Sequence, residues 1–312
     1  MGETVTLDTF ARTETARMFR DLQAAAGGPN RWLHNRGATA IDAQTVVRMN
    51  RDTLYSFAVV DLEKPAELVV PQSGGRYLSV MAVTEDHYIN KVFHDAGVHV
   101  LDPEAIGSRY ALLAARVLAD PDDPADLEKA HEVQDGLALL HRDGEPFVMP
   151  DVDVASLDGL RTALAALAPY GFDSRRAFGS RHHVDPLQHL IGTAVGWGGL
   201  PETEAVYDLA AMGLPDGHYT IHVDDVPVDG FWSLSVYDAN GFFAPNDLGR
   251  YSVNSVTAQR DADGGVTINL GGDPALPNQI PLPAGWNATV RLYRPHREIV
   301  DGSWTFPAPV PA

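Results

Sequence analysis

The sequence contains no cysteine among its 312 residues. This absence excludes disulfide bonds, thiolate nucleophiles and cysteine-ligated zinc or iron-sulfur sites, so any metal would need histidine and carboxylate ligands. Basic residues are also scarce, because 23 lysines and arginines stand against 42 aspartates and glutamates, for a formal charge of -19. Such a charge repels phosphate backbones and anionic bilayers, so we expect neither nucleic acid nor a membrane as a partner.

Long apolar runs and targeting segments are missing as well. No run approaches the length of a membrane span, and the N-terminal stretch MGETVTLDTFARTETARMF has no basic region followed by a continuous apolar core. We therefore predict a cytoplasmic location. The length and the hydrophobic content of 45% predict a globular protein with a substantial core, built as two modest domains or as one domain with an insertion.

The motifs of several large enzyme classes are absent too. The sequence has no Gly-x-Ser-x-Gly elbow, no Walker A loop and no dinucleotide fingerprint between a strand and a helix. The stretch HEVQD from His131 begins like a zinc-protease helix but carries Asp135 where the second histidine should stand. We therefore predict a protein without an organic cofactor.

Apolar periodicity and turn residues predict a mainly β protein with a helical insertion, α+β overall. A first helix is expected over residues 8–26, capped by Asp8 and ended by Gly27-Gly28. The expected strands before the insertion are 46–61, 66–70, 77–83, 88–93, 98–101 and 110–118. A tight turn at residues 95–97 is expected to join two of them.

Helical spacing dominates the middle of the chain. Asp123-Pro124 and Asp185-Pro186 are helix starts, and leucines recur at helical spacing over residues 156–168. Strands are expected again at 218–223, 231–237, 266–270 and 288–293. We predict an N-terminal β-sandwich domain over residues 1–120, a helical connector over 121–200 and a jelly-roll-like domain over 201–312.

The twelve histidines do not form a convincing metal motif. His182 and His189 would share a helical face only if the helix began before Asp185-Pro186. His94 and His99 flank the expected turn at residues 95–97, where a hairpin could bring them together near His87. The pair His218 and His222 would lie about 13 Å apart on a strand. We therefore predict no stoichiometric structural zinc.

The stretch VVRMNRDTLYSFAVVD, residues 46–61, carries polar groups where a strand should fill a core. Arg48, Asn50 and Asp52 would share one face, whereas Arg51 and Tyr55 would lie on the other. Two interpretations stay open. The polar groups either form a network that fastens the sheet, or they form a pocket floor that holds an anionic or carbonyl group.

The order of several sequence blocks resembles a bacterial family. The N-terminal blocks are NRDTLYS from Asn50, VDL from Val60, GRY from Gly75 and DHYIN from Asp86, and they resemble the domain of unknown function numbered 1254. The C-terminal blocks FWSLSVYD from Phe231, RYS from Arg250, DGG from Asp263, VRLYRP from Val290 and GSW from Gly302 resemble the domain of unknown function numbered 1214. The resemblance implies two β-sandwich-like domains with a helical insertion, and it implies little about a reaction.

Two classes of function remain open. In the first, the chain is an enzyme that performs acid-base chemistry of hydrolase or lyase type on a small polar or carbonyl-bearing metabolite, in a pocket between two β domains. In the second, it is a non-catalytic module that binds a saccharide, a polyol or another small ligand. An assembly of identical chains is compatible with both. The predicted catalytic residues are Arg51, Asp52, Tyr55 and His87, and the predicted ligand-binding residues are Asn50, Trp197, Arg250 and Tyr251.

Overall fold

The computed structural model describes residues 2–44, 47–140 and 143–312, which form two compact units. Unit 1 contains the residues up to Gly37 together with Thr53–Pro201, and unit 2 contains Ala38–Asp52 and Glu202–Ala312. Strands make up about 28% and helices about 22% of the structure, which confirms the predicted mainly β, α+β class. The named strands pair antiparallel, apart from β13 with β14, so the sheets are not of the parallel, helix-wrapped kind.

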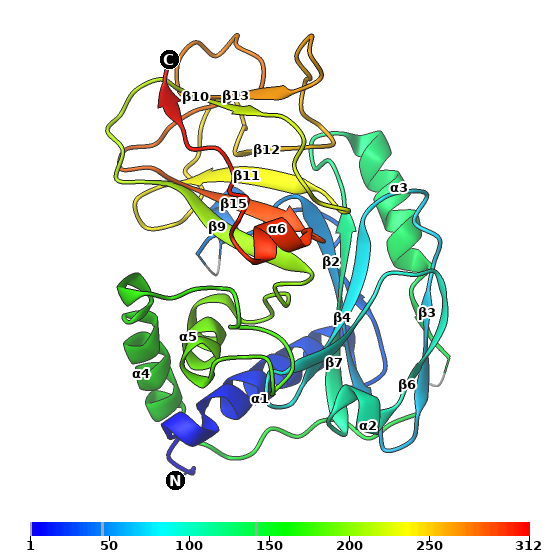
Figure 1. Ribbon diagram of the computed structural model, residues 1–312. Coiled ribbons are helices and arrows are strands. Elements are labelled where there is room, and N and C mark those ends of the chain that lie inside the picture. The colour runs from blue at the N-terminus through cyan, green and yellow to red at the C-terminus, as the bar shows by residue number, and fades with distance from the viewer. Residues whose placement is uncertain (1, 45–46, 141–142) are drawn as a thin grey trace. The chain divides into compact units, whose positions relative to one another are not determined.

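A five-stranded sheet forms the centre of unit 1 (Figure 1). Its order is β1 (Leu33–His34), β2 (Thr53–Asp61), β7 (Tyr110–Leu118), β4 (Leu78–Thr84) and β5 (Ile89–Phe93). Strands β2 and β7 pair along their full length, with Thr53 opposite Leu118 and Asp61 opposite Tyr110. This register places Asp61 beside the beginning of β7.

A second sheet of unit 1 shares a core with the first. Its order is β6 (Gly97–Leu101), β3 (Ala66–Val70) and β8 (Ala138–Leu139). Leu68 and Leu101 from this sheet pack in one cluster with Val80 and Leu113 from the five-stranded sheet, and all four are fully buried. Helices α2 (Pro103–Ile106) and α3 (Pro124–Asp135) add Ile106, Ala130 and Val133 to that core.

Three other helices of unit 1 pack together (Figure 1): α1 (Leu7–Ala26), α4 (Val154–Ala165) and α5 (Pro186–Gly196). Their common cluster contains Phe10, Leu157 and Leu164. Both predicted proline starts are confirmed, because Asp123 caps α3 and Asp185 caps α5, each with proline at the first helical position. Short 3-10 turns are also present, at Ala168–Tyr170 in unit 1 and at Ile41–Ala43 in unit 2.

Unit 2 consists of two four-stranded sheets that share one apolar core. The first has the order β12 (Ser252–Asn254), β11 (Trp232–Tyr237), β15 (Asn287–Tyr293) and β9 (Ala205–Met212). The second has the order β14 (Gln279–Ile280), β13 (Val266–Leu270), β10 (Tyr219–Val223) and β16 (Val310–Pro311). Leu234 and Val290 pack with Ile221 and Ile268 across the two sheets, and α6 (Arg297–Val300) adds Ile299.

The strand predicted over residues 46–61 is too long at its N-terminal end. It begins at Thr53, whereas residues 47 and 48 form a turn in which Arg48 has a φ of 50°. Asn50 Oδ1 accepts the backbone amide of Asp52 at 2.7 Å, a local bond that replaces a strand-to-strand bond. Val46 lies outside the described residues.

The hairpin expected across residues 95–97 does not form. Strand β5 pairs with β4, and β6 pairs with β3 in the other sheet. Gly97 has a φ of 145°, a conformation that glycine readily adopts, and the chain leaves the first sheet at this turn. His94 and His99 bond separate backbone oxygens, Leu78 O and Asp95 O respectively. The described helices include none that is both long enough and apolar enough to cross a membrane.

Candidate functional site

The polar stretch at residues 48–55 is divided between the two units. Asn50, Arg51 and Asp52 lie in the segment Ala38–Asp52 of unit 2, whereas Tyr55 lies on β2 of unit 1. The sequence predicted one continuous strand here, whereas in the structure these residues belong to two different units.

The sheet β12-β11-β15-β9 of unit 2 has one apolar and one polar face. Leu234 on β11 lies opposite Val290 on β15 and belongs to the core. The neighbouring positions point the other way, because side chains alternate along a strand. They form what we call the polar face, which consists of Ser233, Ser235, Tyr237, Ser252, Asn254, Asn287, Thr289, Arg291 and Tyr293.

Arg291 stands in the middle of the polar face and is only 3% exposed. Its Nη1 donates to Ser235 Oγ at 3.1 Å, and its Nη2 donates to Tyr237 Oη at 2.7 Å and to the backbone oxygen of Arg48 at 2.7 Å. Burial acts to lower the pKa of Arg291, but the electrostatic influence of Tyr237, Tyr293 and Asp52 raises it overall. Arg291 therefore remains a cation inside unit 2.

Asp52 lies on the same face as a buried carboxylate, 2% exposed. Its Oδ1 accepts a long hydrogen bond of 3.3 Å from Asn254 Nδ2, and its Oδ2 has no partner among the described residues. Burial raises the pKa of Asp52 above its ordinary value, although Arg291, Ser233 and Asn254 act in the opposite direction. Asp52 thus retains a proton at a higher pH than an exposed aspartate does.

Four buried polar atoms on or against the polar face lack a hydrogen-bond partner in the described structure. They are Asp52 Oδ2, Ser233 Oγ, Thr289 Oγ1 and Arg48 Nε. Ser233 lies close enough to lower the pKa of Asp52, yet the two side chains do not form a hydrogen bond of ordinary geometry. Because native proteins leave few buried polar atoms unsatisfied, such a cluster marks a place for ordered water or a polar ligand.

The other predicted site residues of unit 2 are Asn50, Arg51, Arg250 and Tyr251. Asn50 Nδ2 donates to Tyr293 Oη at 2.8 Å. Arg51 donates to Thr39 O at 2.8 Å, and its guanidinium lies 5.4 Å from the ring centre of Tyr251. Arg250 is exposed and donates to the backbone of Pro274 at 2.9 Å. Asn50 and Asp52 are therefore part of the polar face environment, whereas Arg250 bonds outside it.

His87, in unit 1, is fully buried and both of its ring nitrogens are bonded. Nε2 accepts the amide of Gly198 at 2.9 Å, so Nδ1 carries the proton and donates to Thr193 Oγ1 at 2.8 Å. Burial, with the nearby His189, holds the pKa of His87 well below its ordinary value. Trp197 stacks on His87 at 5.2 Å and donates to Thr15 Oγ1. His87 and Trp197 together hold the glycine-rich turn at residues 196–199 in place.

Tyr55 lies near the same glycine-rich turn. The guanidinium of Arg116 lies 5.2 Å from the centre of the Tyr55 ring and donates to Gly198 O at 2.6 Å. Arg116 is 5% exposed. The structure therefore brings Tyr55, His87 and Trp197 together around Gly198 in unit 1, while it brings Asn50 and Asp52 together with Arg291 in unit 2.

The histidine clusters considered from sequence are dispersed. His182 and His183 precede α5, which begins at Pro186, and His189 within that helix bonds the backbone oxygens of Ala177 and Asp86. These contacts fix His189 inside unit 1. The absence of stoichiometric zinc stays a prediction.

One group of potential metal ligands lies on unit 2. His222, Asp261 and Asp263 have donor atoms within 4.8 Å of one another, and His222 Nε2 also lies 3.0 Å from Asp224 Oδ1. His222 and Asp263 are exposed, and exposed acidic groups of this kind are common without an ion. We assign no metal role to them.

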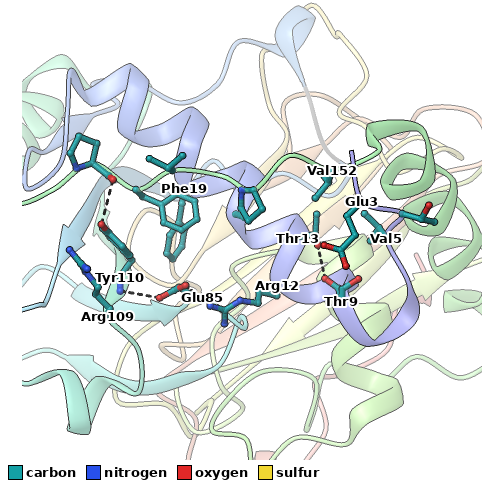
Figure 2. Close-up of a pocket in the computed structure, with 16 residues that line it drawn as sticks. Glu3, Val5, Thr9, Arg12, Thr13, Phe19, Glu85, Arg109, Tyr110 and Val152 are labelled. Carbon is teal, nitrogen blue, oxygen red and sulfur yellow. Dashed lines mark hydrogen bonds and ion pairs between the residues drawn. The ribbon is translucent and has the colours of Figure 1, made fainter. Parts of the chain in front are cut away.

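A groove of about 480 Å³ lies in unit 1 (Figure 2). One wall is a face of α1, and the opposite wall is the extended segment at residues 146–152. None of the eight predicted site residues lines it. The lining residues are Glu3, Thr4, Val5, Thr9, Arg12, Thr13, Ala16, Phe19, Glu85, Arg109, Tyr110, Pro146, Phe147, Val148, Pro150 and Val152.

Sequence reasoning missed Arg291, Ser233 and Thr289, although a signal was present. Serines alternate with apolar residues in FWSLSVYD, and Asn287, Thr289 and Arg291 alternate in the same way. Such alternation normally indicates a solvent-facing side. Only the structure shows that these polar residues are buried.

Two sequence profiles match the chain. Residues 29–99 match "Protein of unknown function (DUF1254)", and residues 212–297 match "Protein of unknown function (DUF1214)". No curated protein matches the sequence.

Two solved structures have the same fold at low sequence identity. The crystal structure of the VPA0106 protein from Vibrio parahaemolyticus is 19% identical with a TM-score of 0.72, and the match covers 98% of this chain and 97% of that one. A putative uncharacterized protein from Burkholderia cenocepacia is 13% identical with a TM-score of 0.54, covering 97% and 87%. These likenesses concern the fold alone. The resemblance seen in the sequence blocks is confirmed in the same order: this chain combines a DUF1254 region in its N-terminal part with a DUF1214 region in its C-terminal part.

Proposed function

We propose that unit 2 binds a small polar molecule with a carbonyl or carboxylate group on the polar face, and that Asp52 acts there as an acid-base group. The observation that supports this most is the cluster of four buried polar atoms without partners around Asp52 and Arg291. A ligand with oxygen and hydroxyl groups would satisfy them, and the free energy of those new hydrogen bonds would favour binding.

The side chains of the polar face suit distinct roles. Arg291 supplies a fixed positive charge toward which a carbonyl or carboxylate oxygen is drawn. The raised pKa of Asp52 brings its proton exchange closer to neutrality, as general acid-base catalysis requires. The hydroxyls of Ser233 and Thr289 can donate or accept hydrogen bonds and would fix the orientation of the ligand.

A second candidate is non-catalytic binding of a saccharide or polyol. Three of the four unpartnered atoms belong to one carboxylate and two hydroxyls, groups that pair well with ligand hydroxyls. The two candidates share the site and differ in one respect. A catalyst changes the ligand, and a binding module releases it unchanged.

The binding claim is tested by thermal shift with short keto acids, hydroxy acids, aldehydes and polyols, because a ligand specific for the folded state raises its apparent stability. Ser233→Ala should reduce the shift given by the best compound. Ser79→Ala is the matched control, since Ser79 Oγ is also buried and unpartnered but lies on β4 of unit 1. If no compound gives a shift, or if both variants respond alike, the binding proposal is wrong.

The catalytic claim is tested with Asp52→Asn and the same compound. An enzyme should lose at least about tenfold in turnover while the affinity changes less. A binding module should convert nothing, and Asp52→Asn should then affect affinity alone.

A further inference from the structure

The groove of unit 1 has two walls, and no residue of the polar face lines it. On α1, residues Thr9, Thr13 and Ala16 line it at the three- and four-residue spacing of one helical face. Between the levels of Thr9 and Phe19, ten residues of helix span about 15 Å. The groove is therefore long enough for a slender molecule.

The opposite wall, the segment at residues 146–152, is held by hydrogen bonds at both ends. Gln23 donates to Phe147 O at 3.1 Å and accepts the amide of Phe147 at 2.8 Å. At the far end, the backbone of Glu3 bonds Asp151 O at 3.0 Å and the amide of Asp153 at 2.8 Å. These bonds fix the position of the segment at residues 146–152 before any ligand binds, which lowers the entropic cost of binding.

The two ends of the groove differ in chemistry. Phe19, Phe147 and Tyr110 form an aromatic end, with ring centres 5.3 and 5.2 Å apart in edge contacts. Figure 2 shows Glu3 beside Thr9 at the other end, with Arg12 and Glu85 between the two ends. An apolar body fits the first end, and a polar group fits the second.

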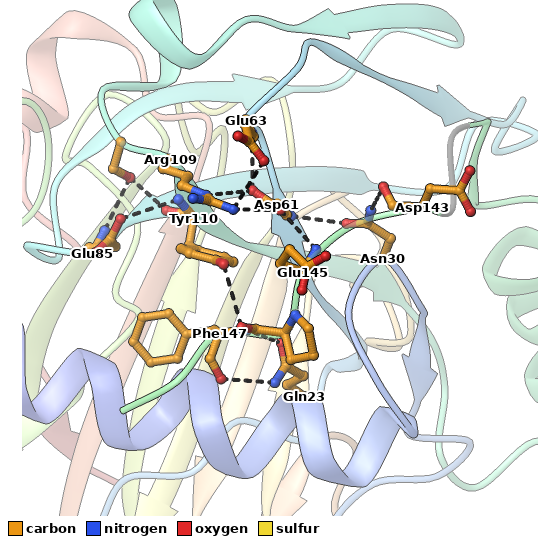
Figure 3. Close-up of polar contacts among 12 residues, drawn as sticks. Gln23, Asn30, Asp61, Glu63, Glu85, Arg109, Tyr110, Asp143, Glu145 and Phe147 are labelled. Carbon is orange, nitrogen blue, oxygen red and sulfur yellow. Dashed lines mark hydrogen bonds and ion pairs between the residues drawn. The ribbon is translucent and has the colours of Figure 1, made fainter. Parts of the chain in front are cut away.

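Both arginines of the groove are already neutralised. Arg109 donates to Asp61 at 2.9 and 3.1 Å and to Glu63 at 3.3 Å (Figure 3). Arg12 donates to Glu85 at 2.6 Å and to Asp86 at 2.9 Å. Each arginine thus faces two carboxylates, and an anionic ligand would have to displace one of them.

Negative charge is in excess at the groove. Glu3 makes no ion pair within the described part of the chain. Burial raises the pKa of Tyr110, and the carboxylates of Asp61, Glu145 and Glu85 raise it further, against the influence of Arg109. The net charge of -19 also attracts cations at long range.

We propose that this groove binds a slender cationic amphiphile, with its apolar body along the aromatic end and its ammonium group beside Glu3. The orientation follows from Arg109, whose guanidinium already lies 5.1 Å from the ring centre of Tyr110 and disfavours a second cation there. The proposal concerns unit 1 and does not depend on the polar face of unit 2.

Calorimetry with three probes of equal length tests the charge preference: 6-phenylhexylamine, 6-phenylhexanol and 6-phenylhexanoate. The amine should bind most tightly and the carboxylate most weakly. Glu3→Gln should weaken the binding of the amine about threefold, the scale of an exposed ion pair, and leave the binding of the alcohol unchanged. Tightest binding of the carboxylate, absence of binding by all three probes, or an amine affinity unaffected by Glu3→Gln would overturn the proposal.

Two further variants test the location. Ala16→Leu fills the groove and should weaken the amine at least about tenfold, because the space for its body is lost. Ala25→Leu makes the same change at an exposed position of α1 outside the groove and should have no effect. If Ala16→Leu fails to fold, Val148→Lys replaces it, since Val148 lines the groove and is 79% exposed. The added charge should weaken the binding of the amine and strengthen that of the carboxylate. Equal affinities of the native protein and Val148→Lys for both probes would contradict the assignment.

Discussion

At Asp52 two effects oppose each other. Burial favours the neutral acid, whereas the charge of Arg291 favours the carboxylate, and the pKa of Asp52 is raised on balance. The carboxylate accepts one long hydrogen bond, and Arg291 makes its own bonds to Ser235, Tyr237 and the backbone of Arg48. Each partner therefore depends little on the other for its hydrogen bonds, which is unusual for a structural ion pair.

Asp52→Asn should consequently cost less than about 1 kcal/mol in the free energy of unfolding at pH 7, where a fastening pair would cost about 3 kcal/mol. The sign of the pH dependence follows from the raised pKa. Above the ordinary value of 3.8 and up to the raised pKa, the folded protein holds more protons than the unfolded chain, so its stability falls as pH rises. Urea unfolding from pH 4 upward should show this fall in the native protein and its reduction in Asp52→Asn. An equal pH dependence in both would contradict the account.

The pKa of Asp61 is shifted in the opposite direction to that of Asp52. Burial alone would raise its pKa, but hydrogen bonds from Arg109 and from the amides of Glu145 and Glu63 hold the pKa below its ordinary value. Asp61→Asn loses acceptors for these donors and should cost about 2 kcal/mol at pH 7. The stability from Asp61 is present above pH 3.8 and is lost as pH falls through the lowered pKa, so the gap between native protein and variant should narrow in acid. Glu63→Gln, at an exposed side chain, is the control and should change little.

At the scale of elements, local signals predicted most helices and strands. The proline starts at Asp123 and Asp185 and strands 66–70, 110–118 and 266–270 are confirmed because cap chemistry and alternation act within a few residues. Strand β9 was missed, and the strand at 46–61 was extended too far. The apolar residues before Arg48 resemble a strand, and the local bond of Asn50 that ends the extended backbone depends on a side-chain conformation that sequence does not show.

Helix α5 provides a test at this scale. Asp185 accepts the amides of Leu187 and Gln188 at 3.0 and 3.1 Å, and α5 carries the Thr193 that bonds His87. Asp185→Ala should therefore cost about 1 kcal/mol of stability, measured by urea unfolding. Asp122→Ala, at an exposed position just before α3, should leave stability unchanged. Equal effects of the two variants would mean that the cap does not stabilise the helix.

At the scale of the whole molecule, the chain is not divided at a single point. The segment Ala38–Asp52 belongs to unit 2 although unit 1 precedes and follows it. The sequence blocks indicated two β regions and a helical insertion. They could not indicate that residues 38–52 belong to the C-terminal unit. This assignment results from contacts between residues far apart in the sequence. The backbone amide of Arg48 donates to Gly241 O, and the Gln44 side chain both donates to and accepts from the backbone of Phe243.

Hydrogen exchange tests this assignment. Ile268→Ala removes a fully buried side chain from the core of unit 2, and Leu113→Ala does the same in unit 1, each at about 2–5 kcal/mol. Amides at residues 47–52 should exchange faster in Ile268→Ala, together with residues 202–312. Faster exchange of residues 47–52 in Leu113→Ala alone would show that the segment belongs to unit 1.

We propose that the polar face around Asp52 and Arg291 receives a small molecule. A high-resolution crystal structure with the most stabilising compound of the thermal-shift set tests it most directly. We expect density for that compound on the polar face, with an oxygen or hydroxyl bonded to Asp52 Oδ2 and another to Ser233 Oγ. A compound bound elsewhere, with Asp52 Oδ2 and Ser233 Oγ bonded directly to each other, would contradict it.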